Sequence, residues 1–286
     1  MSEVQTPKVF KKGYGSNFVI PFAIVLIGSL IIFGVSKMLQ SDRGYKDLVR
    51  ELHSKTFGNR WIAAFELSKV ISAKGIPTEE VPWLVENLDE LYISALDNRT
   101  KNFIIVTLGA LKDPIGIKTI ELGLEDLDPQ TKFHAIVALS QLNMTDSYDW
   151  GKLLPFLDSE DEGLKQATIL ALATHRVEAA KDKLMLNLDS DSRNIRFASA
   201  TGLIYFEEKQ ALPLLNQILS LEVSNTNEPN ALDEDKVYGL KLNVINGLKK
   251  TRWKELANIV ANNIEREKNL KLVTLGREVL EDLKKN

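Results

Sequence analysis

The feature that most constrains the fold is a pattern of acid, base and leucine that returns at intervals along the chain. Residues 128–142 show it best: in the sequence DPQTKFHAIVALSQL, apolar residues recur every three or four positions, which is the period of an α-helix. Asp128 can cap the N-terminus of this helix, and Pro129 suits the first helical position because its missing N–H needs no partner there. The stretch predicts one amphipathic helix, and its recurrence predicts a repeated unit.

Basic residues mark the same position in each copy of the pattern, and most of them follow an acid or hydroxyl residue by four positions. They are Arg60, Lys101, Lys132, Lys165 and Arg196, spaced 31 to 41 residues apart, with a weaker copy at Lys241. A leucine lies seven positions after each. Units of this length with two helical patterns are typical of a solenoid of stacked antiparallel helix pairs. We therefore expect an all-α solenoid of about six to seven repeats over residues 41–286. A generic helical bundle is the alternative, but a bundle has no reason to repeat an acid–base pair.

The repeated pattern, Asp-Pro-x-(aliphatic)-(Lys/Arg)-x-x-Ala-x-x-Ala-Leu-x-x-Leu, resembles the second helix of a HEAT repeat. The match is close at 128–142 and 161–172, good at 192–206, fair at 56–70 and 97–111, and poor beyond 237. The shorter units look most like the bacterial HEAT-like repeats that also occur in phycobilisome bilin lyases. In HEAT families the acid and the base form a ladder between neighbouring repeats. The resemblance implies that the following residues are structural: Arg60, Asp97, Lys101, Asp128, Lys132, Asp161, Lys165 and Arg196.

The first 40 residues have a different character. Residues 1–17 lack helical periodicity, and we expect a flexible tail. No charge occurs from Phe18 to Ser36, and the apolar run extends to Leu39 after the single charge of Lys37. About 20 such residues cross the hydrocarbon core of a bilayer. We therefore predict a transmembrane helix at 18–39. A cleaved signal peptide, whose apolar core is usually shorter, and a buried solenoid helix are the alternatives.

Basic residues on both sides of this run bear on its orientation. Three lysines lie in residues 8–12 before the run, and further lysines and arginines lie in residues 37–50 after it. Positive charge favours the cytoplasmic side, so the two ends nearly balance. Because basic residues after the run can belong to the folded body, the sequence favours a cytoplasmic tail and a body on the non-cytoplasmic side.

Two further stretches matter for interactions. Trp61 and Phe65 lie on the apolar stripe of the first repeat, which predicts that they pack in the solenoid core; an interfacial anchor is the alternative for Trp61. Residues 222–236 are polar and acidic and predict a loop inserted into the sixth repeat. Insertions in solenoids often lie on the binding face, although a solvated surface loop is the simpler interpretation.

The sequence contains no local motif typical of a catalytic, phosphate-binding or metal-binding site. The chain has no cysteine, and its three histidines, His53, His134 and His175, lie on different predicted repeats without zinc-ligand spacing. No phosphate-binding glycine loop, nucleophile elbow or HExxH sequence occurs. We therefore predict no catalytic residue, no cofactor and no metal, and a chain that is not an enzyme.

The predicted architecture suggests what the chain does. Stacked helix pairs present long surfaces that hold other proteins, and a membrane span confines such a surface to the bilayer. The leading hypothesis is a membrane-anchored, non-enzymatic scaffold or assembly subunit of a membrane protein complex. One alternative is an enzyme of the bilin-lyase kind. Another is a HEAT-like nucleic-acid binder, which a net charge of −3 disfavours, so that no nucleic-acid partner is expected.

Overall fold

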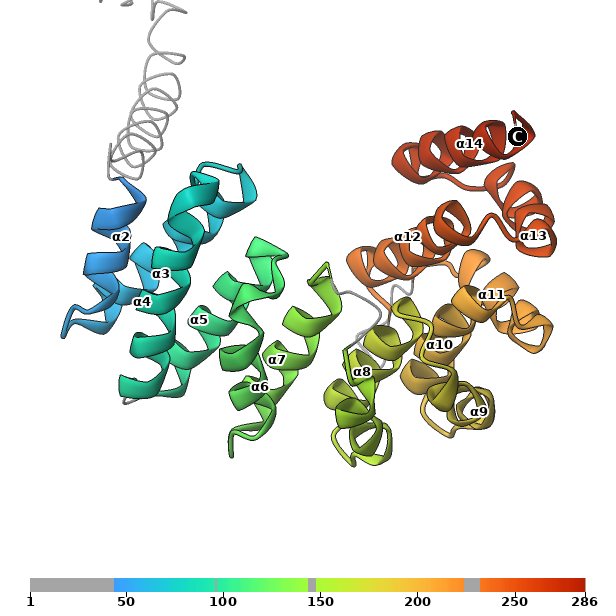
Figure 1. Ribbon diagram of the computed structural model, residues 1–286. Coiled ribbons are helices and arrows are strands. Elements are labelled where there is room, and N and C mark those ends of the chain that lie inside the picture. The colour runs from blue at the N-terminus through green and yellow to red at the C-terminus, as the bar shows by residue number, and fades with distance from the viewer. Residues whose placement is uncertain (1–43, 96, 144–147, 224–231, 286) are drawn as a thin grey trace, which may run out of the picture. The chain divides into compact units, whose positions relative to one another are not determined.

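A computed structural model describes residues 44–95, 97–143, 148–223 and 232–285, and every regular element in them is a helix (Figure 1). The α-helices are α2 Tyr45–Leu52, α3 Phe57–Ser72, α4 Val81–Ser94, α5 Asn98–Leu111, α6 Ile117–Leu124, α7 Pro129–Gln141, α8 Glu162–Thr174, α9 Glu178–Leu186, α10 Arg193–Leu203, α11 Leu212–Leu219, α12 Glu234–Thr251, α13 Lys254–Ile264 and α14 Leu270–Lys284. The 3₁₀ segments are η1 Thr78–Glu80, η2 Pro114–Gly116, η3 Trp150–Asp158, η4 Asn187–Asp189, η5 Ile204–Phe206 and η6 Lys209–Ala211. The prediction of an all-α fold is confirmed for these residues.

The helices pack in the order of a helical-repeat solenoid. The chain divides into two units, residues 1–47 and 48–286, and the second unit holds nearly all of the described residues. Within the second unit, α3 packs on α5, α5 on α7, α7 on α8, and α8 on α10. The helices α4 and α6, the segment η3 and the helix α9 each pack on the helix that follows them. The repeating residues therefore build pairs whose second helices lie side by side.

The recurring acid or hydroxyl residue begins the second helix of most repeats. Asp97, Asp128, Asp161 and Ser192 each accept a hydrogen bond from the backbone N–H three residues later, at 2.9 to 3.4 Å. Such caps satisfy N–H groups that have no partner inside the helix. Thr56, at the same position before α3, forms no side-chain cap. The helix starts thus follow from local sequence.

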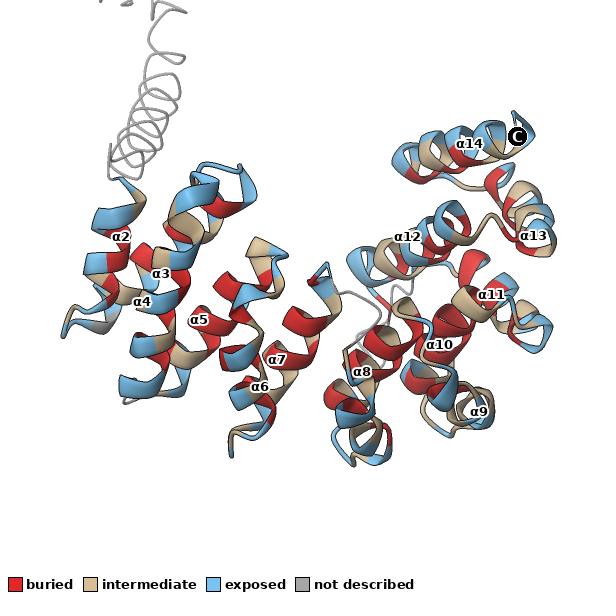
Figure 2. Cartoon of the chain, viewed as in Figure 1, coloured by how far each residue is buried: buried red, intermediate tan, exposed pale blue. Residues whose placement is uncertain are grey.

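The repeated leucine supplies the core of each unit. Leu67, Leu108, Leu139, Leu172, Leu203 and Leu248 are all fully buried. Figure 2 shows the buried residues on the sides of the helices that face their neighbours. Burying one such side chain stabilises the fold by about 1.5–3 kcal/mol relative to leaving it exposed. The period of the leucine is therefore the period of the hydrophobic core.

The prediction that Trp61 and Phe65 pack in the core is wrong. Their side chains are 46% and 47% exposed. The α3 residues that are buried are Ala63, Ala64 and Leu67, together with Ile71 near the end of the helix. At 100° per residue, positions 61 and 65 lie on an adjoining face, roughly 120° around the helix from the centre of this buried set. The apolar residues of α3 thus surround the helix, and only part of them meets a neighbour.

No helix in the described part of the chain combines the length and the apolar character needed to cross a membrane. The predicted tail at 1–17 and the predicted transmembrane helix from Phe18 to Leu39 lie outside the described residues. The predicted span therefore has no support from the structure.

Candidate functional site

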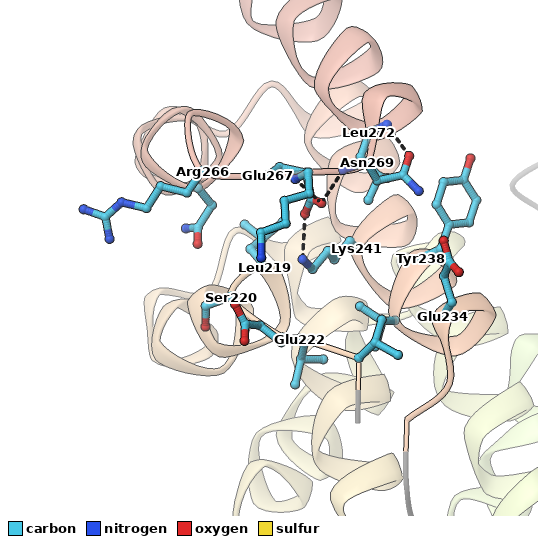
Figure 3. A pocket seen from close by; sticks show the side chains of 15 residues that line it. Leu219, Ser220, Glu222, Glu234, Tyr238, Lys241, Arg266, Glu267, Asn269 and Leu272 are labelled. Carbon is cyan, nitrogen blue, oxygen red and sulfur yellow. Dashed lines mark hydrogen bonds and ion pairs between the residues drawn. The ribbon is translucent and has the colours of Figure 1, made fainter. Parts of the chain in front are cut away.

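A pocket of about 600 Å³ lies near the C-terminal end of the second unit (Figure 3). Its walls come from the end of α11, the first half of α12, and the connection from α13 to α14. Its apolar lining residues are Leu219, Leu221, Val223, Val237 and Leu272. The volume is within the range of sites that bind small molecules, whereas ten of the fifteen lining residues are polar or charged, more than is usual for such sites.

An ion pair between Lys241 and Glu267 lies within this pocket. Lys241 Nζ is 2.6 Å from Glu267 Oε2, and the two side chains are only 10% and 11% exposed. The other carboxylate oxygen, Oε1, accepts the backbone N–H groups of Lys268 and Asn269, each at 2.8 Å. Both oxygens of Glu267 are thus engaged, and the carboxylate is held in one orientation.

These contacts also decide the charge of Glu267. Burial alone raises the pKa of the carboxyl group, but the hydrogen bond and charge of Lys241 and the amides of Asn269 and Lys268 outweigh it, so the pKa is lowered. Glu267 is therefore ionised at neutral pH. An ammonium group has three N–H donors, and within the described residues Glu267 accepts one from Lys241. The other donors can bind a carboxylate or carbonyl oxygen of a ligand.

Charges of both signs surround the mouth of the pocket. Glu222 and Glu234 line one side, and Arg266 and Lys268 line another, all with exposed side chains. Tyr238 adds a phenol ring to the lining (Figure 3). The lining has three carboxylates and three cationic side chains, so its charges balance, and its apolar residues can remove apolar ligand surface from water.

The repeat pattern anticipated the position of Lys241 but not its partner. Lys241 is the weak sixth copy of the recurring base, and Glu267 follows 26 residues later, beyond α13. The same arrangement occurs at Lys101, whose partner Asp126 follows 25 residues later, beyond α6. Asp126 and Glu267 each also accept the backbone N–H of the residue that caps the next helix, Asp128 and Asn269. The signal available in the sequence was the repeat register, which predicts a base on the face of α12 next to the following helix.

The predicted ladder residues lie in several environments. Arg60 Nη2 is 2.9 Å from Asp97 Oδ2 of the next repeat. Lys101 Nζ is 2.8 Å from Asp126 Oδ2, and no ion pair links it to Asp128 in the described residues. Asp126 is nearer because it lies in the turn before α7, where it also accepts the backbone N–H of Asp128.

The other predicted ladder residues make different contacts. Asp128 and Asp161 cap their own helices, and neither Lys132 nor Lys165 forms an ion pair with a described residue. Arg196 Nη1 donates to the carbonyl oxygens at positions 190 and 191, at 2.6 and 2.9 Å. The structural role that the resemblance implies for all of these residues stays a prediction.

The histidines lie apart from the pocket. His53 is exposed, whereas His134 and His175 are partly buried, and burial is the main cause that lowers the pKa of each. The His175 ring stacks on Trp150 with 3.9 Å between centroids. Across the described residues, no three His, Cys, Asp or Glu side chains are placed to hold a metal ion.

Comparisons with known proteins identify the fold. No protein-family model matches the chain, and no curated protein matches its sequence. A chain in the structure of the complex of CpcE and CpcF of phycocyanin lyase from Nostoc sp. PCC7120 is similar, with a TM-score of 0.59 and 15% identity over 85% of this chain and 96% of that chain. The E. coli protein YibA has a TM-score of 0.47 and 12% sequence identity, and the match covers 97% of this chain and 99% of that chain. Human deoxyhypusine hydroxylase in complex with glycerol has a TM-score of 0.33 and 15% sequence identity, and the match covers 84% of this chain and 95% of that chain.

The first of these similarities shows a HEAT-like helical-repeat fold, which confirms the class that the repeated residues predict. It also contradicts the prediction that the chain is not an enzyme, because a protein of the same fold is a part of phycocyanin lyase. That prediction relied on the absence of contiguous motifs. A site on this fold is assembled from separate repeats, as Lys241 and Glu267 illustrate, so local motifs cannot exclude one.

Proposed function

We propose that this chain is a lyase-type HEAT-like protein that works with a protein partner and holds its substrate in the pocket beside Lys241 and Glu267. The pocket itself carries the proposal, because it combines the volume of a small-molecule site with a buried, oriented charge pair. The fold similarity supports the proposal in two respects. The similar chain belongs to a lyase, and it was solved as a complex of CpcE with CpcF.

The chemistry of the pocket suggests the substrate class. Leu219, Val237 and Leu272 provide apolar contact, and the Lys241 ammonium group binds a carboxylate. A linear tetrapyrrole combines an apolar conjugated body with two propionate groups and matches this lining. The chain has no cysteine, so it cannot hold such a group by a thioether of its own. Covalent attachment of such a group through a cysteine would therefore need a second protein as the acceptor.

Titration of the full chain with biliverdin tests this proposal. We expect a shifted and sharpened visible absorption band as the pigment becomes ordered in the pocket. Lys241→Gln removes the charge that orients a propionate and is expected to weaken binding at least about tenfold, the effect of about 1.4 kcal/mol, in protein that circular dichroism shows to be folded. Lys209→Gln is the matched control, because Lys209 forms an exposed ion pair with Glu255 outside the pocket lining.

Two outcomes contradict the proposal. One is an unchanged pigment spectrum at saturating concentrations of the full chain. The other is an equal loss of binding in Lys241→Gln and Lys209→Gln, which would indicate general attraction of the propionates to surface lysines and not binding in the pocket.

The location of the activity is a separate proposal. The uncharged run that begins at Phe18 is long enough to anchor the chain in a membrane, and the basic tail before it favours a body on the non-cytoplasmic side. The protein partner would then be a component of the same membrane. Flotation of the full chain with lipid vesicles tests the anchor independently of pigment binding.

A further inference from the structure

Helix α3 exposes two large aromatic side chains next to each other. Trp61 and Phe65 are one helical turn apart, are 46% and 47% exposed, and stack with parallel rings 5.8 Å apart. Lys69, one turn further, places its Nζ 4.1 Å from the centre of the Phe65 ring. We call these three residues the α3 aromatic face. Within the described residues it is a continuous stripe of two rings and a cation.

The next repeat has an exposed apolar residue at the position equivalent to Phe65. Val106 follows Lys101 by five positions, as Phe65 follows Arg60, and it is 42% exposed. Helix α5 packs directly beside α3, so the equivalent faces of the two helices adjoin. Isolated exposed apolar residues are ordinary, but a contiguous group of them usually marks a contact surface.

The residue types on this face suit a membrane interface. Tryptophan is enriched where lipid headgroups meet hydrocarbon, because its ring is apolar and its N–H is polar. A lysine beside the rings can extend its ammonium group to the phosphate layer while its methylene groups remain near the rings. Hydrophobic contact and positive charge together favour anionic lipid.

Chain length brings α3 within reach of such a surface. Only residues 40–56 separate the predicted span from α3, and eight of them form α2. At about 3.5 Å per extended residue and about 1.5 Å per helical residue, this connection reaches at most roughly 45 Å. Residues 40–56 carry four basic and three acidic residues, a net charge of +1, so the reach of α3 depends on the length of the connection and not on its charge.

We propose that the α3 aromatic face inserts into the headgroup layer of an anionic membrane and forms a second contact beside the predicted span. This inference rests on the proposed membrane anchor. A single span leaves the body free to turn about its connection, whereas a second contact restrains one face of the solenoid against lipid. Because the span already confines the body near the bilayer, even a weak contact is populated.

Tryptophan quenching by brominated lipid provides the test. The full chain is reconstituted in vesicles of phosphatidylcholine and phosphatidylglycerol whose acyl chains are either ordinary or dibrominated near the headgroup. Trp61 is one of four tryptophans, so we expect brominated lipid to remove about a quarter of the emission. Trp61→Phe keeps an aromatic ring but should abolish this quenching. Trp253→Phe, which replaces a buried tryptophan, should leave it intact.

A second variant tests the chemistry of the contact. Phe65→Glu places a carboxylate next to Trp61 and is expected to reduce the quenching of Trp61 at least twofold. Ile115→Glu introduces the same charge at an exposed apolar residue outside the α3 aromatic face and should have no effect.

The possible results distinguish lipid contact by the α3 aromatic face from anchoring by the predicted span. If the full chain floats with vesicles but Trp61→Phe retains the quenching of the wild type, the face does not meet lipid and the proposal is overturned while the anchor stands. If the wild type floats without any quenching, Trp61 does not meet lipid and the proposal is again overturned. Failure of the full chain to float overturns both.

Discussion

At the scale of single residues, Glu267 is the side chain on which the pocket most depends. It accepts hydrogen bonds from the Lys241 ammonium group and from two backbone N–H groups, and it is only 11% exposed. Glu267→Gln leaves the ammonium group of Lys241 inside the fold without a counter-charge. Removing one partner of a buried pair typically costs about 3 kcal/mol or more, so we expect the urea midpoint to fall accordingly.

An exposed ion pair provides the control for this variant. Arg252 and Asp282 are 39% and 62% exposed with 3.1 Å between Nη1 and Oδ2. Asp282→Asn should cost less than about 1 kcal/mol, because water screens exposed charges. Equal losses in the two variants would mean that burial does not strengthen the Lys241–Glu267 pair.

The pH dependence of the same variant has a defined sign. The pKa of Glu267 is lower in the folded chain than its ordinary value of 4.5, so the ionised form is favoured by folding. Its contribution to stability is complete above the ordinary pKa and is lost as the pH falls through the folded pKa. We expect the wild type to lose more free energy of unfolding than Glu267→Gln between about pH 5 and pH 3. If the free energy of unfolding fell equally with pH in the wild type and in Glu267→Gln, Glu267 would not be the source of this pH dependence.

At the scale of elements, small residues set how closely the second helices approach. A Cβ added to Gly109 of α5 would lie 2.8 Å from Ala138 Cβ and 2.9 Å from Ala138 Cα of α7. These contacts involve a backbone atom, so they are relieved only by moving one helix. Gly109→Ala should therefore destabilise the chain by about 1–3 kcal/mol despite its better helix propensity.

Gly239 of α12 is the matched control, because an added Cβ there has no neighbour within 4 Å. Gly239→Ala should stabilise the chain by about 0.5–1 kcal/mol through helix propensity alone. Thermal unfolding followed by circular dichroism measures both variants. A stabilised Gly109→Ala would show that α5 and α7 can move apart without loss.

At the scale of the whole molecule, the property to test is attachment of the chain to a membrane by residues 18–39. The predicted span depends on an uninterrupted apolar run, so the double variant Leu26→Arg and Leu30→Arg should abolish flotation of the full chain with vesicles. Each arginine costs about 2.5–3.5 kcal/mol at the centre of a span. The double variant Leu26→Ala and Leu30→Ala should still float. Flotation of the arginine variant would show that the run is not what binds lipid.

The sequence also predicted most of the fold, because the signals for it are local. Asp128 lies directly before the helix that it caps, and the leucine at position 139 lies on a face defined by the 3.6-residue period. The same reasoning failed for Trp61. Periodicity shows that a helix has an apolar side, but it does not show which sides meet a neighbour when apolar residues surround the helix.

The sequence by itself therefore determined the helix pairs, their starts and the leucines of the core, because each depends on residues within one or two turns of one another. Only the tertiary structure decided that Lys241 pairs with Glu267 across α13 and that Lys101 pairs with Asp126. Only the tertiary structure showed that the side chains of Trp61 and Phe65 are exposed. Each of these depends on how a repeat stacks against the next, and that geometry arises from close packing between helices and not from the period within one.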